Sequence, residues 1–522
     1  MTRRVRTRYA PSPTGSPHVG NLRTALFSYL LAKRFGGDFL LRVEDTDQGR
    51  LVPGALKDII ASLQAMGMMY DEGPDLASVA ALDKAKYGDV PRDMLPSFGG
   101  DSGPYFQSQR LPRYREVVNQ LLAEGKAYYA FETVAELDRM RAAADARKVP
   151  FVYDRRYRDV PLAEGKARAD AGEPCVVRFK MPIEGSIKAD DAVRGEIVWD
   201  AATQDDFVIL KGDGFPPYHL AAMVDDHDMQ ISHVLRGEEW IPSYPKHAEL
   251  LRALGWELPV FVHTPSVLAP SRKKLSKREG ARPVIGELTD SKTGEKIPGY
   301  IDHEGVLPDA LFNFLALVGW APGDDSEIMR RDEIVRKFDI GGISPSPGIF
   351  DIDKLYWMNG AYIRELPGAV LTERSLPFLK RAGLVPESPD AEALAYIGRV
   401  ISLEQERIKV LSEVPELTEY FFLDLPNYNE KSAAKWIADA GAKTFLSLLA
   451  ERLSTVSPWD HDSLEAATRA AGAECGREKG DITHPTRVAV SGRENGPGLF
   501  EMMAVLGRER VLRRLAHAAE GH

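Results

Sequence analysis

The sequence predicts an α/β fold with a parallel sheet, followed by an all-helical region. A strand–helix–strand pattern opens the chain, and beyond residue 348 apolar residues recur at helical spacing, for example Leu446, Leu449 and Leu453. A chain of 522 residues corresponds to about three or four domains, each able to bury a large core.

The opening pattern occupies residues 5–43. Residues 5–9 form the first expected strand, the proline-rich stretch after them excludes regular structure, and from Leu22 apolar residues fall at i, i+3, i+4, i+7 and i+8. A glycine pair ends this helix, and residues 39–43 form a second strand. This is a β-α-β unit, so we expect the two strands to be parallel and the crossover between them to be right-handed.

The turn before this helix has the chemistry of a phosphate site. The helix N-terminus near Asn21 offers unpaired N–H groups and a partial positive charge to an anion. Gly20 has no Cβ, so a base or a phosphate can approach the backbone there. His18 directly precedes the helix and is placed to donate hydrogen bonds to a triphosphate. The alternative for His18 is a helix cap or a packing residue.

A basic segment much later in the chain reads Lys274-Leu275-Ser276-Lys277. Pro270 precedes it and Gly280 closes it, which predicts a mobile loop, although a solvated surface is the alternative. Two lysines three positions apart suit a loop that folds over a nucleotide, with Lys277 on the α-phosphate and pyrophosphate. The sequence contains neither a P-loop motif nor G-x-G-x-x-G after a strand, which favours adenylyl transfer over γ-phosphoryl transfer.

The two segments, in this order, resemble the ATP signatures of class I aminoacyl-tRNA synthetases. The chain also resembles bacterial glutamyl-tRNA synthetases, in family order, at residues 8–15, 41–47, 218–227, 235–240, 307–314 and 350–359. It departs from the family pattern at Val19, Asn21, Leu275 and Arg278 within the two signatures. It also has Ala222 where relatives can have Asn, so any amide contact there is lost.

The resemblance implies a glutamate–tRNA ligase that uses ATP with Mg²⁺, forms glutamyl-adenylate and transfers glutamate to the 3′ end of tRNA(Glu). His18 and Lys277 would be the catalytic residues. The expected ATP-binding residues are Ser12, His18, Gly20, Asn21, Glu239, Lys274, Ser276 and Lys277. The expected glutamate-binding residues are Arg8, Ala10, Ser12, Glu44, Tyr218 and Arg236.

The chemistry of glutamate supports three of these residues. A carboxylate needs a fixed cation, best a guanidinium in bidentate geometry, and Arg8 and Arg236 are the candidates. An α-amino group needs a carboxylate, and Glu44 follows the second strand, where open α/β sheets bind ligands. The alternative for Glu44 is a solvated acidic turn.

The order of the patterns predicts a Rossmann-like nucleotide fold that is split by an insertion. The expected parts are residues 1–112, the first half of the catalytic domain; 113–209, an inserted domain for the tRNA acceptor end; 210–268, the second half; 269–348, the lysine loop and a stem-contact region; and 349–522, a helical anticodon-binding domain. Residues 91–104 and 289–304 resemble further insertions without an assigned role.

The helical tail resembles the anticodon-binding region of bacterial glutamyl enzymes, and its alternative is a dimerisation or scaffold bundle. Relatives that discriminate between tRNA(Glu) and tRNA(Gln) have an arginine before a Pro-containing turn. Alignment by eye puts Gln405 at that position, whereas a shift of two residues would put Arg407 there. Because a neutral amide can donate or accept, Gln405 predicts relaxed specificity, with tRNA(Gln) as a second substrate.

Composition limits the location and the partners. The net charge of −10 leaves RNA binding to local basic patches. Only Cys175 and Cys475 occur, which excludes a disulfide scaffold and a Cys-based zinc cluster, so no protein-bound zinc or other metal is expected. The sequence has no long apolar run and no signal peptide, which predicts a location in the cytoplasm without membrane contact. The family resemblance implies a monomer.

Two other functions fit parts of the sequence. A nucleotide-regulated RNA-binding protein without catalysis would need a degenerate His18 or lysine loop, and neither is degenerate. A small-molecule adenylyltransferase of the same superfamily would leave the helical tail without a role.

Overall fold

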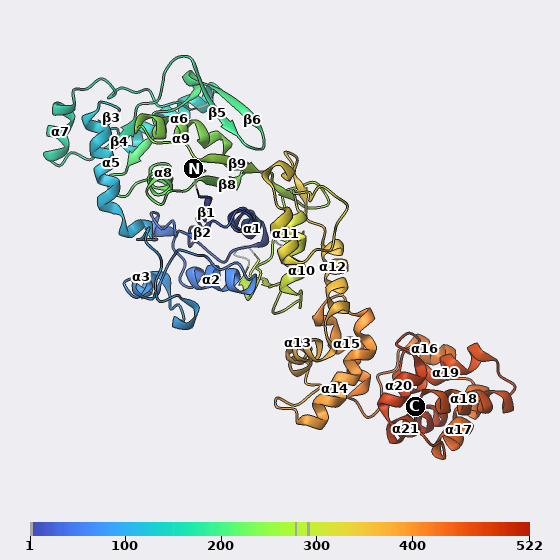
Figure 1. Cartoon of the computed structure of the whole chain (residues 1–522). Helices are drawn as coiled ribbons and strands as arrows, with labels where there is room; N and C mark the ends of the chain where they lie inside the picture. Colours follow the sequence, from blue (N-terminus) through green and yellow to red (C-terminus); the bar gives the residue numbers. More distant parts are fainter. Residues whose placement is uncertain (1–3, 150, 277–278, 290–292, 522) are drawn as a thin grey trace. The chain divides into compact units, whose positions relative to one another are not determined.

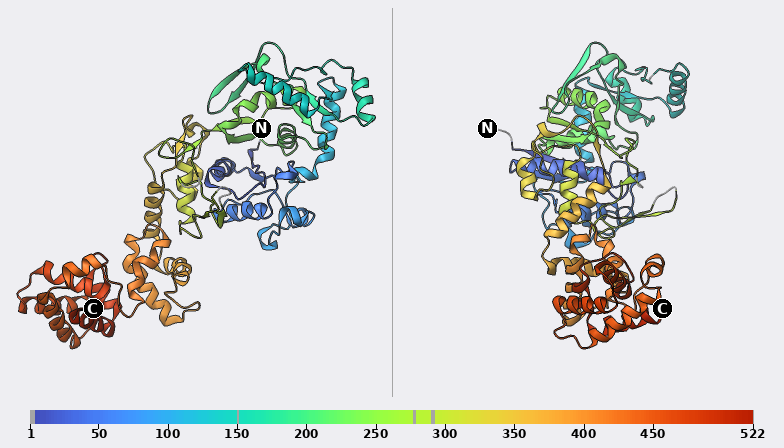
Figure 2. Two further views of the ribbon diagram at one scale, coloured as in Figure 1. Left: turned by 180° about the vertical axis from the view of Figure 1, so that it is seen from behind. Right: turned by 90° about the vertical axis from the view of Figure 1, so that its right-hand side faces the viewer.

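The structure is a computed structural model that describes residues 4–149, 151–276, 279–289 and 293–521. The chain forms two compact units, one of residues 1–303 and 308–352 and one of residues 304–307 and 353–522. All strands of the described residues belong to the first unit, and the second contains helices and their connections (Figures 1 and 2). The predicted order of an α/β part and a helical part is confirmed.

The opening strand–helix–strand unit is confirmed as well. β1 (Arg6–Tyr9) pairs in parallel with β2 (Asp38–Leu41), and α1 (Val19–Arg34) connects them. Leu22, Leu26 and Leu30 of α1 are fully buried, as their spacing predicts.

The neighbouring strands of the core come from much later in the chain. β8 (His233–Gly237) pairs in parallel with β9 (Val260–Thr264). The N–H of Ser232 donates to the carbonyl oxygen of Arg6 at 2.9 Å, which places β1 beside β8 (Figure 1). The fold is therefore split in sequence, as predicted, and the carboxyl ends of β1, β2 and β8 lie at one edge.

The segment predicted as an insertion, residues 113–209, divides between two sheets. β3 (Ala127–Ala130), β4 (Val176–Phe179) and β7 (Val208–Leu210) form a separate antiparallel sheet. The hairpin of β5 (Ser186–Asp191) and β6 (Gly195–Asp200) instead joins the main sheet, in the order β6-β5-β9-β8. Backbone pairing of Asp191 with Phe261 makes this junction, which the sequence pattern did not predict.

The other elements of the first unit surround these sheets. α1 packs on β1, β2 and β8, and α8 (Tyr218–Asp228) packs on α9 (Tyr244–Ala253). The remaining helices are α2 (Ala55–Ala65), α3 (Leu76–Ala80), α4 (Lys84–Tyr87), α5 (Leu111–Ala123), α6 (Val134–Ala146), α7 (Leu162–Asp170), α10 (Pro308–Leu317) and α11 (Arg331–Lys337). The short strands are β10 (Val267–Leu268), which pairs with β13 (Gly348–Ile349), and β11 (Glu287–Thr289), which pairs with β12 (Lys296–Pro298).

The helical unit has a core of its own. Leu446, Leu449 and Leu453 of α17 (Ala440–Ser454) are fully buried, as predicted, and α17 packs on α18 (His461–Glu474) and α21 (Arg508–Glu520). The other helices are α12 (Ile352–Glu365), α13 (Gly368–Arg381), α14 (Ala391–Glu404), α15 (Val414–Thr418), α16 (Glu430–Trp436), α19 (Lys479–Ser491) and α20 (Leu499–Leu506). Among the described residues, no helix combines the length and the apolar character that a membrane span requires.

Candidate active site

A cavity of about 660 Å³ opens at the carboxyl ends of β1, β2 and β8. It brings together predicted residues that lie more than 200 positions apart in the chain. The predicted residues that line it are Arg8, Ala10, Ser12, Asn21, Glu44, Tyr218, Arg236 and Glu239. His18, Gly20, Lys274 and Ser276 are not part of this lining, and Lys277 lies outside the described residues.

His18 is the N-cap of α1. Its Nδ1 accepts a hydrogen bond from the N–H of Gly20 at 3.1 Å, so a neutral ring carries its proton on Nε2. The neighbouring Asn21 lines the cavity, so the helix N-terminus reaches its wall. The N–H groups of Asn21 and Leu22 donate to the carbonyl oxygen of His18, at 3.0 and 3.1 Å, so the unpaired N–H groups predicted there are bonded within the protein. His18 therefore acts as the helix cap that was the alternative reading, and its proposed role toward the phosphates stays a prediction.

The absence of a side chain at Gly20 makes room for the ring of His18. A Cβ on Gly20 would lie 3.0 Å from Cε1 of His18. The imidazole of His18 therefore lies where a side chain on Gly20 would lie, and the approach of a base or phosphate to Gly20 stays a prediction.

The described part of the lysine loop forms turns. Lys274 makes a bridge to Leu268, and the hydroxyl of Ser276 donates to Oε2 of Glu279 at 2.6 Å. Gly280 has a φ of 127°, and a Cβ there would lie 2.6 Å from the ring of Phe350. The loop therefore closes at a position that requires glycine.

Arg8 belongs to a buried network of ion pairs. Its Nε donates to Oδ1 of Asp226 at 3.0 Å, and Nη1 of Arg42 donates to the same oxygen at 2.7 Å. Nη2 of Arg42 donates to Oε1 of Glu44 at 3.1 Å. On the far side of Arg42, Asp225 accepts from Nε of Arg110 at 2.7 Å.

Burial decides the titration of Glu44. It raises the pKa of Glu44 to about 7, against the opposing effects of Arg42 and Arg8. For Asp226 the balance is reversed: burial opposes ionisation, but Arg8 and Arg42 lower its pKa overall. Glu44 thus exchanges a proton near neutral pH, whereas Asp226 stays an anion.

Arg236 has a different environment. It lies within β8, and its guanidinium contacts two buried histidines, His247 and His263. Its Nη2 is buried and makes no well-aligned hydrogen bond among the described residues, although the hydroxyl of Tyr218 lies against the guanidinium as a weak hydrogen-bond partner. Burial also raises the pKa of the Tyr218 hydroxyl, which therefore stays protonated.

Sequence reasoning missed several residues of this site. Asp225 and Asp226 lie in the segment 218–227 but received no predicted role. Two adjacent carboxylates in an apolar helix need buried cationic partners, which is the signal that could have identified them. Lys211 and Trp240 also line the cavity, and the rings of Trp240 and Tyr218 lie 4.5 Å apart. Tyr218 and Trp240 lie in the segments 218–227 and 235–240 of the family resemblance, but no periodicity indicates that their rings meet.

In the helical unit, the two candidate anticodon residues differ in their surroundings. Nε2 of Gln405 donates to the carbonyl oxygens of Ile363 and Leu366, both at 2.9 Å, at the end of α12. Arg407 is exposed, and its Nη1 donates to Oε2 of the buried Glu404 at 3.0 Å. The amide nitrogen of Gln405 is therefore used within the protein, whereas Arg407 faces solvent.

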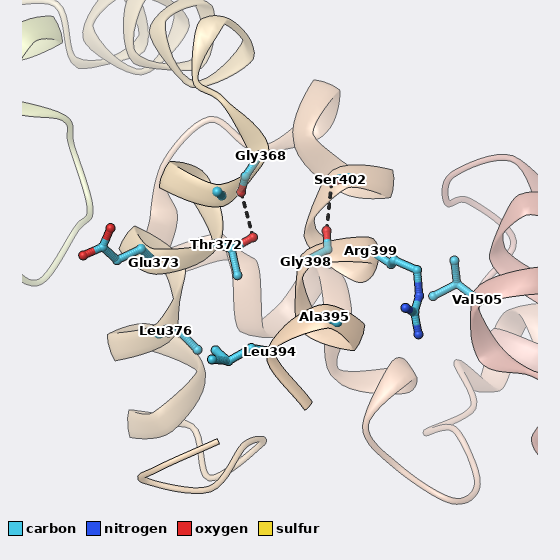
Figure 3. A pocket seen from close by; sticks show the side chains of 11 residues that line it. Gly368, Thr372, Glu373, Leu376, Leu394, Ala395, Gly398, Arg399, Ser402 and Val505 are labelled. Atoms are coloured by element: carbon cyan, nitrogen blue, oxygen red, sulfur yellow. Dashed lines mark hydrogen bonds between the residues drawn. The ribbon is translucent and has the colours of Figure 1, made fainter. Parts of the chain in front are cut away.

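A second cavity of about 840 Å³ lies in the helical unit, between α13 and α14 (Figure 3). The hydroxyls of Thr372 and Ser402 donate to carbonyl oxygens of their own helices, at Gly368 and Gly398 (Figure 3). The lining is therefore mostly apolar, and it includes neither of the two candidate anticodon residues.

The chain matches known proteins over its whole length. Residues 4–357 match the family of tRNA synthetases class I (E and Q), catalytic domain, and residues 370–519 match an anticodon binding domain. Glutamate–tRNA ligases of Dehalococcoides mccartyi and Moorella thermoacetica are 42% and 41% identical to it, each over 99% of this chain and 98% of the relative. The crystal structure of a glutamate tRNA ligase from Elizabethkingia meningosepticum in complex with its amino acid has a TM-score of 0.87 at 34% identity, and covers 99% of this chain and 100% of that one.

The fold, the cavity and the two family matches define an aminoacyl-tRNA synthetase of class I, an enzyme that uses ATP. Within this class, the chain belongs to the glutamate–tRNA ligase family, because relatives of that family match it from end to end.

Proposed function

We propose that the chain charges tRNA(Glu) with glutamate in two steps at the β1–β2–β8 cavity. A carboxylate oxygen of glutamate attacks the α-phosphorus of ATP, and pyrophosphate leaves. The terminal ribose hydroxyl of the tRNA then attacks the carbonyl carbon, and AMP leaves. The observation that supports this most is one cavity that holds two arginines, a carboxylate and a helix N-terminus.

Glutamate is bound by charge at both ends. Arg236, whose guanidinium makes no salt bridge within the described ranges, receives a carboxylate, with Arg8 beside it. Glu44 in its ionised form receives the α-amino group. The hydroxyls of Ser12 and Tyr218 and the backbone at Ala10 complete the contacts.

ATP binds beside glutamate. His18 donates from Nε2 to the phosphates, and the positive end of the α1 dipole, near Asn21, faces the same charge. Lys274, Ser276 and Lys277 approach from the lysine loop, and Glu239 holds the nucleoside. Mg²⁺ enters as the ATP complex and neutralises phosphate oxygens. Catalysis depends on positioning and charge stabilisation, since no side-chain nucleophile is required.

The tRNA is read by the helical unit, and specificity is relaxed. Gln405 is neutral and bonded to the end of α12, so it presents no rigid fork that would exclude a wrong base. Arg407 is the exposed cation that contacts the anticodon in either tRNA. We propose further that the five expected parts of the chain act in one monomer in the cytoplasm.

The test is charging of purified tRNA transcripts with radiolabelled glutamate by the full-length protein. Glutamate should become acid-precipitable only when ATP, Mg²⁺ and tRNA(Glu) are all present, and glutamine should not replace glutamate. A labelled small-molecule product that forms without tRNA acceptance would support an adenylyltransferase and contradict the proposal.

A further inference from the structure

The guanidinium of Arg236 is held by histidines, not by carboxylates. In the parallel register of β8 and β9, His263 is the direct neighbour of Arg236. Nε of Arg236 donates to Nε2 of His263 at 3.0 Å, and Nη1 donates to Nδ1 of His247 at 2.8 Å. All three side chains are buried, and within the described residues no salt bridge involves Arg236.

The guanidinium determines where both rings carry their protons, because it can only donate hydrogen bonds. His263 must accept at Nε2, so its proton is on Nδ1, which contacts Oδ2 of Asp191 at 2.7 Å. His247 must accept at Nδ1, so its proton is on Nε2, which lies 3.0 Å from Nδ1 of His219. Asp191, at the end of β5, therefore orients His263, and His219, on α8, orients His247.

Both rings are neutral for the same reason. Burial lowers the pKa of His247 well below its ordinary value, and Arg236 adds to this effect. Burial also lowers the pKa of His263, against the opposing hydrogen bond to Asp191. A neutral acceptor fixes a guanidinium without cancelling its charge, whereas Arg8 is already paired with Asp226.

We propose that His247 and His263 are positioning residues that hold Arg236 with its Nη2 directed to a carboxylate of the amino-acid substrate. This inference rests on the proposed role of the cavity as the glutamate site. Arginine side chains lose considerable rotamer freedom when they are immobilised, and preorganisation removes that cost from ligand binding. The carboxylate then meets a fixed guanidinium that is not bonded to a carboxylate among the described residues of the protein.

The experiment compares His247→Leu, which removes the acceptor, with His247→Asn, whose amide oxygen can accept near the position of Nδ1. The glutamate KM of the leucine variant should rise roughly ten- to hundredfold, as expected for the loss of a hydrogen bond to a charged group. Its kcat and its KM for ATP should stay within about threefold of the wild type, and the asparagine variant should recover most of the glutamate KM. Tyr244→Phe is the matched control. It deletes a hydrogen bond from a buried hydroxyl to the carbonyl oxygen of Asp190 in the same core, but it removes no acceptor of Arg236.

An unchanged glutamate KM in a folded His247→Leu variant, or an asparagine variant as impaired as the leucine variant, would overturn the inference. If His247→Leu does not fold, NMR of the wild-type protein with ¹⁵N-labelled histidine decides, because the inference requires one neutral ring protonated at Nδ1 and one at Nε2 at these positions. A charged ring at either position contradicts it. Failure of the wild-type protein to charge tRNA would instead contradict the proposed function.

Discussion

The imidazole of His18 occupies the space that a side chain on Gly20 would need. A Cβ at Gly20 would lie 3.0 Å from Cε1 and 3.1 Å from Nδ1 of His18, and the same Nδ1 accepts the Gly20 N–H. The glycine two positions after the histidine therefore lets the ring fold back onto the first turn of α1. This relationship gives the first prediction.

Gly20→Ala should displace the His18 ring and lower kcat roughly tenfold, because small misplacements of a catalytic group are costly. Thermal stability should change little, since alanine favours the helix as much as the crowding opposes it. Gly49→Ala is the matched control, because a Cβ there makes only an ordinary contact, at 3.9 Å from Asp47. An unaltered kcat in Gly20→Ala would show that the ring position does not matter for the reaction.

Replacement of His18 or Lys277 by alanine should lower kcat roughly 10²–10³-fold, because each is expected to stabilise charge in the transition state. The affinity for tRNA should stay close to that of the wild type. The measurement is pyrophosphate exchange in the presence of tRNA, together with a filter-binding assay. Near-normal exchange in either variant would remove that residue from the catalytic machinery.

The two arginines of the cavity should respond differently to mutation. Arg236→Gln should raise the glutamate KM by the equivalent of about 2–5 kcal/mol, because the substrate carboxylate loses its cation. Arg8→Gln should also raise this KM, and in addition should destabilise the fold by about 3–5 kcal/mol, because it leaves buried Asp226 with one partner fewer. Glutamate titration and chemical denaturation of both variants separate the effects. Equal stability losses would contradict the assignment of Arg8 to a structural ion pair.

Stability should fall as the pH decreases from about 6.5 to about 4. Burial, aided by Lys246 and Arg236, lowers the pKa of His219 from 6.5 to about 4, so within this window the unfolded chain binds a proton that the folded chain does not. The loss for this residue is about 3 kcal/mol at the lower limit. Denaturation curves of the wild type and His219→Asn across this range should differ in slope by about one proton. Parallel curves would show that His219 does not titrate as the structure indicates.

Gln405 and Arg407 give a matched pair in the helical unit. Gln405→Ala should destabilise the protein by about 1–2 kcal/mol, because carbonyl oxygens at the end of α12 lose their donor. It should leave the ratio of tRNA(Glu) to tRNA(Gln) charging unchanged, whereas Arg407→Ala should weaken charging of both tRNAs. A kcat/KM for tRNA(Gln) below about 10⁻³ of that for tRNA(Glu), some 4 kcal/mol of discrimination, would rule out relaxed specificity.

The sequence alone determined the features that depend on neighbouring residues. The spacing of Leu22, Leu26 and Leu30 predicted a buried helix face, and the local order of His18 and Gly20 predicted a helix start suited to an anion. Such features are predictable because a periodicity of 3.6 residues, a cap or a turn depends on the residues within a few positions.

Only the tertiary structure decided which distant groups meet. It paired Arg8 with Asp226, placed His263 beside Arg236, and brought the β5–β6 hairpin of the predicted insertion into the main sheet. Local patterns do not encode these contacts, because pairing between remote strands depends on the packing of the whole sheet. The tertiary structure also decided which arginine has its charge available to a ligand. Arg8 is paired with a carboxylate and Arg236 is held by neutral rings, and the sequence does not distinguish these two environments.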